Sequence, residues 1–149
     1  MVYRWMYISR ATTSEGSLDD VGIYLKSRGR NRDLCITGFL HRECDHYAQY
    51  IEGETESILR LRSLIMQDPR HTDLRILAQG VMTPRLFAGW EMAYASRGAL
   101  GFSEFHRDLG RKRDLSVATL SETLCYMQMA TADGQAVDVM RRFPDRRRM

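Results

Sequence analysis

Two side chains far apart in the sequence, Tyr7 and Gln49, have the chemistry of a hydrogen-bond switch. A tyrosine supplies a phenolic O–H and an oxidisable ring, and a glutamine amide carries a donor at one end and an acceptor at the other. Turning that amide by half a turn exchanges donor and acceptor without moving the backbone. Taken singly, each residue would be ordinary sheet packing. The sequence shows no nucleophile–base pair or carboxylate dyad that would indicate an enzyme.

These residues fall in a regular order of predicted strands and helices. Short runs rich in aromatic and β-branched residues indicate strands, and apolar residues at helical spacing indicate helices. The predicted strands are residues 2–9, 34–41, 46–51, 74–82 and 89–94, and the predicted helices are residues 17–28 and 54–68. Two βαβ crossovers that share a hairpin form a ferredoxin-like α+β domain, with both helices on one sheet face. The first and third strands are then neighbours, so Tyr7 and Gln49 can share that face.

The rest of the chain is predicted to be a helical appendage. Residues 102–109, 115–129 and 135–142 have helical patterns, so we divide the chain into a domain at 1–95, an appendage at 96–143 and a basic tail at 144–149. We expect the appendage to pack on the open sheet face or on another subunit. Its methionines suggest an adaptable apolar face, with core packing as the default explanation: Met127, Met129 and Met140.

The net charge of +3 belongs to the end of the chain. Residues 141–149 hold five arginines and one aspartate, a net +4, so the other residues sum to −1. Arginines without interleaved aromatic residues are typical of a disordered terminus, so we do not expect nucleic-acid binding. No apolar run is long enough to cross a bilayer, and the N-terminus does not resemble a signal peptide. We therefore expect a soluble, cytoplasmic protein without a membrane partner.

The cysteines and histidines give no clear metal or disulfide site. Three cysteines, an odd number at wide spacing, do not form a disulfide framework. His41, Cys44 and His46 are zinc-ligand types on a predicted hairpin tip, but the spacing fixes no fourth ligand. We expect a solvated turn there and no bound metal, and we expect Cys35 to be buried in the second strand.

Five separated motifs, in order, resemble the BLUF family of blue-light sensors that bind FAD on a ferredoxin-like domain. The resemblance covers about residues 2–95 and is carried by Tyr3-Arg-Trp-Met-Tyr7-Ile-Ser9, Asn31-x5-Thr37-Gly38-x-Leu40, Gln49-x-x-Glu52-Gly53, Gln67-Asp-Pro-Arg-His71 and Arg85-x-Phe87-x-x-Trp90-x-Met92. It implies a short, stand-alone photoreceptor without an output domain on its chain.

The resemblance also implies a mechanism and a set of site residues. FAD would lie between the two helices, Tyr7 would pass an electron and a proton toward it, and Gln49 would rearrange into a slightly red-shifted signalling state. Trp90 and Met92, on the fifth strand, would pass the change to the C-terminal helices. The protein would act as a homo-oligomer or on a separate signalling protein, and not as an enzyme. The implied cofactor contacts are Tyr7, Ile23, Asn31, Gln49 and Ile65.

Two positions depart from the family pattern. Leu64 stands where the family usually has an arginine that approaches the flavin edge, and Ala48 stands where it has a bulky aromatic residue. The alternative interpretation is therefore a flavin-free, ferredoxin-like interaction module. The sequence also lacks a glycine-rich phosphate loop. Candidate phosphate ligands are arginines that could equally form a solvated helix end: Arg28, Arg30 and Arg32.

Overall fold

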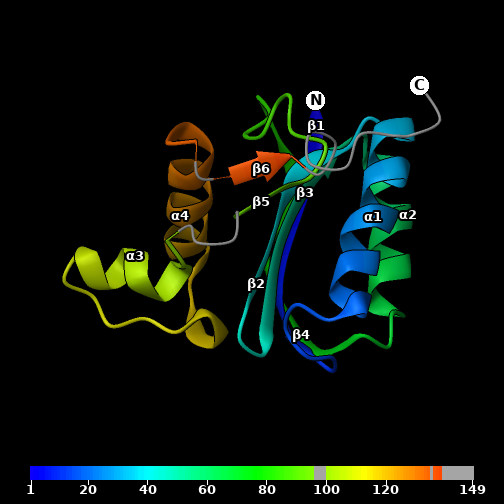
Figure 1. The fold of residues 1–149 in the computed structure, drawn as a ribbon. Coiled ribbons are helices and arrows are strands. Elements are labelled where there is room, and N and C mark those ends of the chain that lie inside the picture. Colours follow the sequence, from blue (N-terminus) through cyan, green and yellow to red (C-terminus); the bar gives the residue numbers. More distant parts are fainter. Residues whose placement is uncertain (96–99, 135, 139–149) are drawn as a thin grey trace, which may run out of the picture.

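The computed structural model describes residues 1–95, 100–134 and 136–138 (Figure 1). Its strands are β1 (Val2–Ala11), β2 (Thr37–Glu43), β3 (His46–Gly53), β4 (His71–Met82), β5 (Ala93–Ala95) and β6 (Ala136–Asp138). Its helices are α1 (Leu18–Asp33), α2 (Thr55–Met66), α3 (Phe102–Asp108), the 3₁₀ turn η1 (Leu115–Val117) and α4 (Leu120–Ala132). The first seven elements confirm the predicted βαββαββ order.

The strands form one mixed sheet in the order β4-β1-β3-β2-β5-β6. Strand β1 lies in the interior and pairs antiparallel with β3 and β4, and β2 pairs antiparallel with β3. Strand β5 runs parallel to β2, where Phe39 is registered with Ala93. This is the predicted ferredoxin-like α+β fold, with β6 added at one edge.

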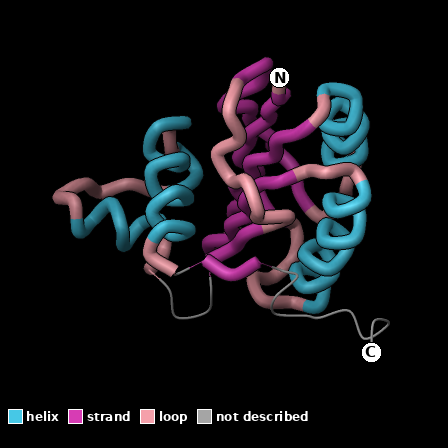
Figure 2. The backbone as a smooth tube through the Cα atoms, turned by 90° about the horizontal axis from the view of Figure 1, so that it is seen from above, coloured by secondary structure: helices cyan, strands magenta, loops and turns pink. Residues whose placement is uncertain are grey.

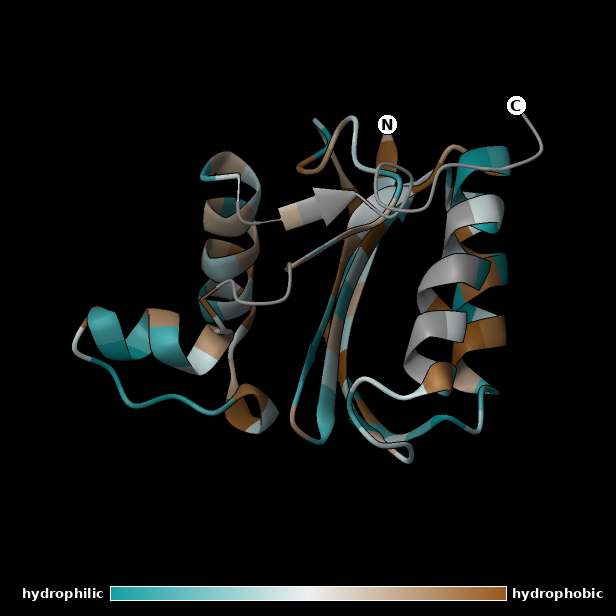
Figure 3. Cartoon of the chain, in the orientation of Figure 1, coloured by the Kyte–Doolittle hydropathy of each residue, from teal (hydrophilic) through white to brown (hydrophobic). Residues whose placement is uncertain are grey.

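Helices cover both faces of the sheet, as the view in Figure 2 shows. Helices α1 and α2 lie on one face, and Ile23, Ile58 and Leu61 pack there against strand residues. Helices α3 and α4 lie on the other face, where Phe102 and Tyr126 belong to a second apolar core. The appendage therefore packs on the open sheet face. Helix α3 is largely hydrophilic, whereas α4, beside the sheet, is more apolar (Figure 3).

Strand alternation separates the two cores. In β1, Trp5 and Tyr7 belong to the core under α1 and α2, whereas Met6 and Ile8 belong to the core under α3 and α4. Successive side chains of a strand point to opposite faces, so a strand buried on both faces carries a continuous apolar run. This explains why residues 2–9 show no alternation between apolar and polar residues.

The structure corrects the predictions for the C-terminal part. Ala136–Asp138, inside the helix predicted at 135–142, form β6, which pairs antiparallel with β5. The edge of β5 offers backbone partners that the local sequence does not reveal. The helix predicted at 115–129 is divided into η1 and α4, because Thr119 caps α4 in a capping box with Glu122. The basic tail and Met140 lie outside the described residues.

The ends of two strands also differ from the prediction. Helix α1 extends to Asp33, and Cys35 follows with a φ of 52°, so β2 begins only at Thr37. Cys35 is exposed, and the expectation that it is buried in a strand is wrong. A left-handed residue is a common helix terminator, although glycine usually fills the position. Strand β5 is short, and Trp90 and Met92 precede it.

Candidate functional site

The structure places Tyr7 and Gln49 opposite each other on β1 and β3. The Tyr7 hydroxyl donates a hydrogen bond of 2.6 Å to Gln49 Oε1, and both side chains are buried. Burial, with smaller contributions from Tyr47 and Asp68, raises the pKa of the Tyr7 hydroxyl well above its usual range. The phenol therefore stays protonated and donates to the amide oxygen.

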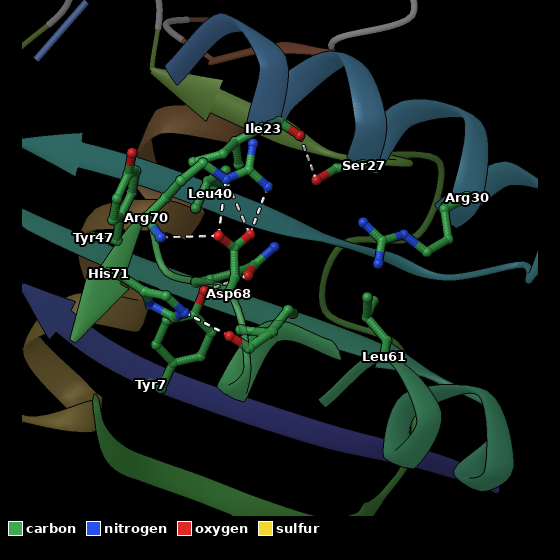
Figure 4. Close-up of a pocket in the computed structure, with 12 residues that line it drawn as sticks. Tyr7, Ile23, Ser27, Arg30, Leu40, Tyr47, Leu61, Asp68, Arg70 and His71 are labelled. Carbon is green, nitrogen blue, oxygen red and sulfur yellow. Dashed lines mark hydrogen bonds and ion pairs between the residues drawn. The ribbon is translucent and has the colours of Figure 1, made fainter. Parts of the chain in front are cut away.

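A pocket opens beside this pair, between α1, α2 and the sheet (Figure 4). Ile23 of α1 and Ile65 of α2 contribute apolar surface, while Tyr7 and Gln49 supply polar groups from the strands. A cleft in which apolar surface meets convergent polar groups is the usual form of a small-molecule site. The other lining residues are Ser27, Arg30, Leu40, Tyr47, Leu61, Asp68, Arg70 and His71.

The pocket lining contains two arginines, Arg30 and Arg70, and one carboxylate, Asp68, which pairs with Arg70. Arg70 Nε donates to both Asp68 oxygens, at 2.9 and 3.1 Å, and this contact lowers the pKa of Asp68 and raises that of Arg70. Burial and the positive charge of Arg70 lower the pKa of Arg30. One carboxylate thus faces two cations, and the excess positive charge suits an anionic ligand. A wider groove, lined also by Lys26 and Leu64, shares Arg30 and Arg70 with the pocket.

The His71 side chain connects β1 with the end of α2 at the pocket. Its Nδ1 lies 2.7 Å from Ser9 Oγ, and its Nε2 lies 2.6 Å from the Ile65 carbonyl oxygen. The Gln67–His71 motif therefore supplies three pocket residues, Asp68, Arg70 and His71, that were not among the predicted cofactor contacts. Their position just after α2, within a motif already noted, was the available signal.

Asn31 sits apart from the pocket lining. Its side chain is buried, and Nδ2 donates to the Glu91 carbonyl oxygen at 2.8 Å. Within the part of the chain that the structure describes, Asn31 Oδ1 is buried and has no hydrogen-bond partner. A buried acceptor without a partner is costly, and it would be satisfied by an N–H donor on a ligand. Asn31 lines a neighbouring hollow together with Arg32 and Arg85.

Met92 and Trp90 contact different cores. Met92 is fully buried under α1 and α2, and its Sδ lies 3.9 Å from Gln49 Nε2. Trp90 is half-buried and packs against the core on the other sheet face, while its carbonyl oxygen accepts from Gly38 N at 3.0 Å. Of the two predicted relay residues, the structure thus brings Met92 to the glutamine.

The two departures from the family pattern do not face the pocket. Leu64 is 51% exposed and lines the outer groove. Ala48 is fully buried in the core under α3 and α4, because its neighbour Gln49 faces the other way. Two arginines near Leu64 are directed elsewhere: Arg60 lies 3.5 Å from Glu56 and Arg62 lies 3.4 Å from Gln79.

Of the candidate phosphate ligands whose side chains the structure describes, Arg30 lines the pocket and Arg32 does not. Arg32 lies 3.9 Å from Asp33 and belongs to the neighbouring hollow. The side chain of Arg28 is outside the described part of the structure. The sequence alone could not show which of these arginines lines the pocket, because that depends on which face of α1 is turned toward the sheet.

The hairpin histidine and cysteine residues are not arranged as a metal site. His41 is buried, and its Nε2 lies 3.2 Å from Glu43 Oε1, whereas Cys44 occupies the exposed turn with a φ of 50°. Within residues 1–95, 100–134 and 136–138, no three His, Cys, Asp or Glu side chains are grouped so that they could hold a metal ion. None of the described helices is long and apolar enough to cross a membrane.

Comparison with known proteins gives a consistent result. Residues 2–93 match the BLUF family, described as sensors of blue light using FAD. The photoactivated adenylate cyclase subunit beta of Euglena gracilis is 33% identical over 91 residues, which are 60% of this chain and 11% of that protein. The chain thus spans about a ninth of the length of this curated relative.

Solved structures show the same likeness. The dark-state structure of the BLUF protein BlrB is 30% identical, with a TM-score of 0.72 over 89% of this chain and 96% of that one. A bacterial light-regulated adenylyl cyclase is 26% identical, with a TM-score of 0.59 over 90% of this chain and 35% of the cyclase. The BlsA ground state, at 24% identity and a TM-score of 0.74 over 87% of each chain, shares the fold.

Proposed function

The chain belongs to the BLUF family of blue-light sensors that use FAD, and from this premise we propose that it signals by a light-driven exchange of hydrogen bonds between Tyr7 and Gln49. The observation that carries the proposal is the 2.6 Å bond between the Tyr7 hydroxyl and Gln49 Oε1 at the wall of the pocket. The bond holds an oxidisable donor against an amide that can reverse its polarity.

The residues present fit FAD. Ile23 and Ile65 offer apolar surface from the two helices to a flat ring, and Asn31 Oδ1 offers a buried acceptor without a partner in the described structure. Arg30 and Arg70 offer positive charge to phosphates. Bound FAD would supply a ring that absorbs blue light and becomes a strong oxidant when excited.

The chain's own residues then carry out a reversible exchange. With FAD bound, Tyr7 would give up an electron to the excited ring, and its phenolic proton would leave in the same direction along the existing hydrogen bond to Gln49 Oε1. The amide, no longer held by the Tyr7 donor, turns so that its nitrogen and oxygen change places. The electron and proton return to Tyr7, which now meets a different end of the amide. Because nothing is permanently transferred to a substrate, the pair works as a switch and not as an enzyme.

We propose that Met92 senses this turn. Its Sδ contacts the Gln49 amide nitrogen, and the next residue, Ala93, begins β5, which pairs with β6. A changed contact at Met92 would thus be passed to β5 and to the segment that follows α4. We propose that the output is a changed contact with a second copy of the chain or with a separate signalling protein. The cytoplasmic location stays a prediction from the sequence.

Absorption spectra of the purified protein test the proposal. A yellow protein with a reversible red shift under blue light supports the sensor, and a colourless protein that does not take up FAD supports the flavin-free alternative. Tyr7→Phe and Gln49→Leu should each abolish the shift while FAD stays bound. Tyr50→Phe is the matched control, since Tyr50 belongs to the core on the other sheet face. A shift that persists in either site variant would contradict the assigned roles.

A further inference from the structure

The carboxylate of Glu43, the last residue of β2, binds the first turn of α3. Its Oε1 accepts from Phe102 N at 2.7 Å, and its Oε2 accepts from Ser103 Oγ at 2.7 Å and from Ser103 N at 3.3 Å. His41 Nε2 lies 3.2 Å from Oε1. A side chain of the sheet thus takes the capping position of a helix whose own N-cap residue, Gly101, has no side chain.

The local structure is built around this contact. A Cβ atom at Gly101 would lie 2.6 Å from Glu43 Oε1, so any larger residue there would displace the carboxylate. Burial alone would raise the pKa of Glu43, but hydrogen bonds from His41, Ser103 and Phe102 lower it to about 2. The carboxylate is therefore charged at neutral pH, and its hydrogen bonds are charge-assisted.

The same strand reaches the light-sensing pocket. Leu40 is registered with Gln49 and lines the pocket, and its neighbour His41 faces the other side of the sheet. There the His41 ring lies 4.9 Å from the ring of Tyr126 in α4. Consecutive residues of β2 thus contact the pocket on one face and the appendage on the other.

The remaining contacts between α3, α4 and the sheet are mainly apolar. Phe102 and Tyr126 pack with Phe39 in the second core. Farther along the appendage, Arg75 of β4 donates to the Ser116 and Ala118 carbonyl oxygens beside η1. Apolar packing is non-directional, whereas the hydrogen bonds from Phe102 and Ser103 to the Glu43 carboxylate are directional.

We propose that Glu43 is a positioning residue that holds the C-terminal helices against the sheet in the dark, and that the signalling state acts by loosening this contact. The proposal rests on the function proposed above, because the loosening would begin with the change at Gln49, which is registered with Leu40 of β2. Light would then alter the protection of α3 and α4 without a rearrangement of the sheet.

Hydrogen–deuterium exchange of the full chain with FAD bound, in the dark and under blue light, tests this role. The variants are Glu43→Gln, which keeps an acceptor oxygen but loses the charge, and Ser103→Ala, which removes one of the hydrogen bonds. Asp114→Asn is the control: Asp114 accepts hydrogen bonds from Ser116 N and Ser116 Oγ, both within the appendage. Exchange in β1 and β3 reports whether each variant is folded.

The wild type should lose protection in residues 102–109 and 120–132 under light. Glu43→Gln should show roughly ten-fold faster exchange there in the dark and little further change in light, since charged hydrogen bonds are the stronger ones. Its absorption shift should persist, because Tyr7 and Gln49 are intact. Dark exchange like that of the wild type, or an undiminished light response in Glu43→Gln, would overturn the role of Glu43.

The two proposals fail in different ways. A wild type without any absorption shift would contradict the proposed light-sensing function. A normal shift with no light-dependent exchange in residues 102–109 would overturn the inference about Glu43 alone. A Ser103→Ala variant that responds halfway between the wild type and Glu43→Gln would support a graded contact.

Discussion

Replacing Arg30 should weaken the binding of phosphorylated flavins and leave riboflavin binding almost unchanged. Arg30 lies near the end of α1, lines both the pocket and the outer groove, and is only partly buried. Its pKa is lowered by burial and by Arg70, so the cation lacks full compensation from the protein. The diphosphate of FAD would provide that compensation, whereas the ring of riboflavin carries no phosphate.

The size of the effect follows from the exposure of the site. A hydrogen bond to a charged group contributes about 1.5 to 3 kcal/mol when well buried. Because Arg30 is only partly buried, solvent screening reduces the contribution of its contact with phosphate to about 1 kcal/mol. At about 1.4 kcal/mol per factor of ten, Arg30→Gln should lower the affinity for FAD about five-fold. Added salt should shrink the difference, because ions screen exposed charges.

The assay is calorimetric titration of the apoprotein with FAD and with riboflavin, at low and at high salt. Arg32→Gln is the control, since Arg32 lies two residues further along α1 but outside the pocket lining. Two results would contradict the role of Arg30 in binding the phosphates of FAD. If Arg30→Gln weakened riboflavin as much as FAD, Arg30 would be acting on the ring and not on phosphate. If Arg32→Gln had the same effect, general surface charge would be the cause.

Two further predictions concern the carboxylates at the ends of the β2–β3 hairpin. Glu52 is fully buried, and its carboxylate accepts hydrogen bonds from Leu86 N, Phe87 N and Thr37 Oγ1. Glu52→Gln should therefore lower the free energy of unfolding by about 2 kcal/mol, measured by urea titration. The control is Glu54→Gln, because Glu54 is exposed. The pKa of Glu43 is depressed to about 2, so its stabilisation is present above about pH 4.5 and is lost as pH falls toward 2. The free energy of unfolding of the wild type, measured by urea titration at several pH values, should therefore fall between about pH 4.5 and pH 2. In Glu43→Gln this fall should be smaller. A fall of the same size in both proteins would contradict the proposed stabilisation by the Glu43 carboxylate.

The fold could be predicted because its sheet is built from runs with distinct signals. Residues 2–9 and 46–51 are rich in apolar and aromatic residues, as expected for strands covered on both faces. Once the first and third strands were placed side by side, the shared sheet face of Tyr7 and Gln49 followed from topology, whereas the register that sets them opposite each other came from the structure. Strand β6 could not be found in this way, because it forms only by pairing with the edge of β5.

The pocket was predicted in part, for a related reason. Ile65 lies on a helix face that the apolar spacing directs to the sheet, whereas Ile23 was expected only from the family resemblance; both line the cavity. The charges that complete it, Asp68 and Arg70, follow the end of α2, where no periodic pattern fixes a side-chain direction. The contact between Glu43 and α3 joins residues about sixty positions apart, and local sequence carries no sign of it.

The positions of Trp90 and Met92 show what the spacing could not decide. Two residues separated by one position share a face only inside a strand, because side chains alternate there. Strand β5 begins at Ala93, so the rule does not hold for this pair, and their side chains enter opposite cores. Met92 therefore meets the glutamine on the pocket side, while Trp90 packs with the core that α3 and α4 share. A change at Gln49 would reach Trp90 only through the backbone that joins the two, and the Trp90 carbonyl already holds that backbone to Gly38 of β2. Strand β2 thus contacts both segments through which a change at Gln49 could be passed to the appendage: Leu40 is registered with Gln49, and Gly38 N donates to the Trp90 carbonyl oxygen.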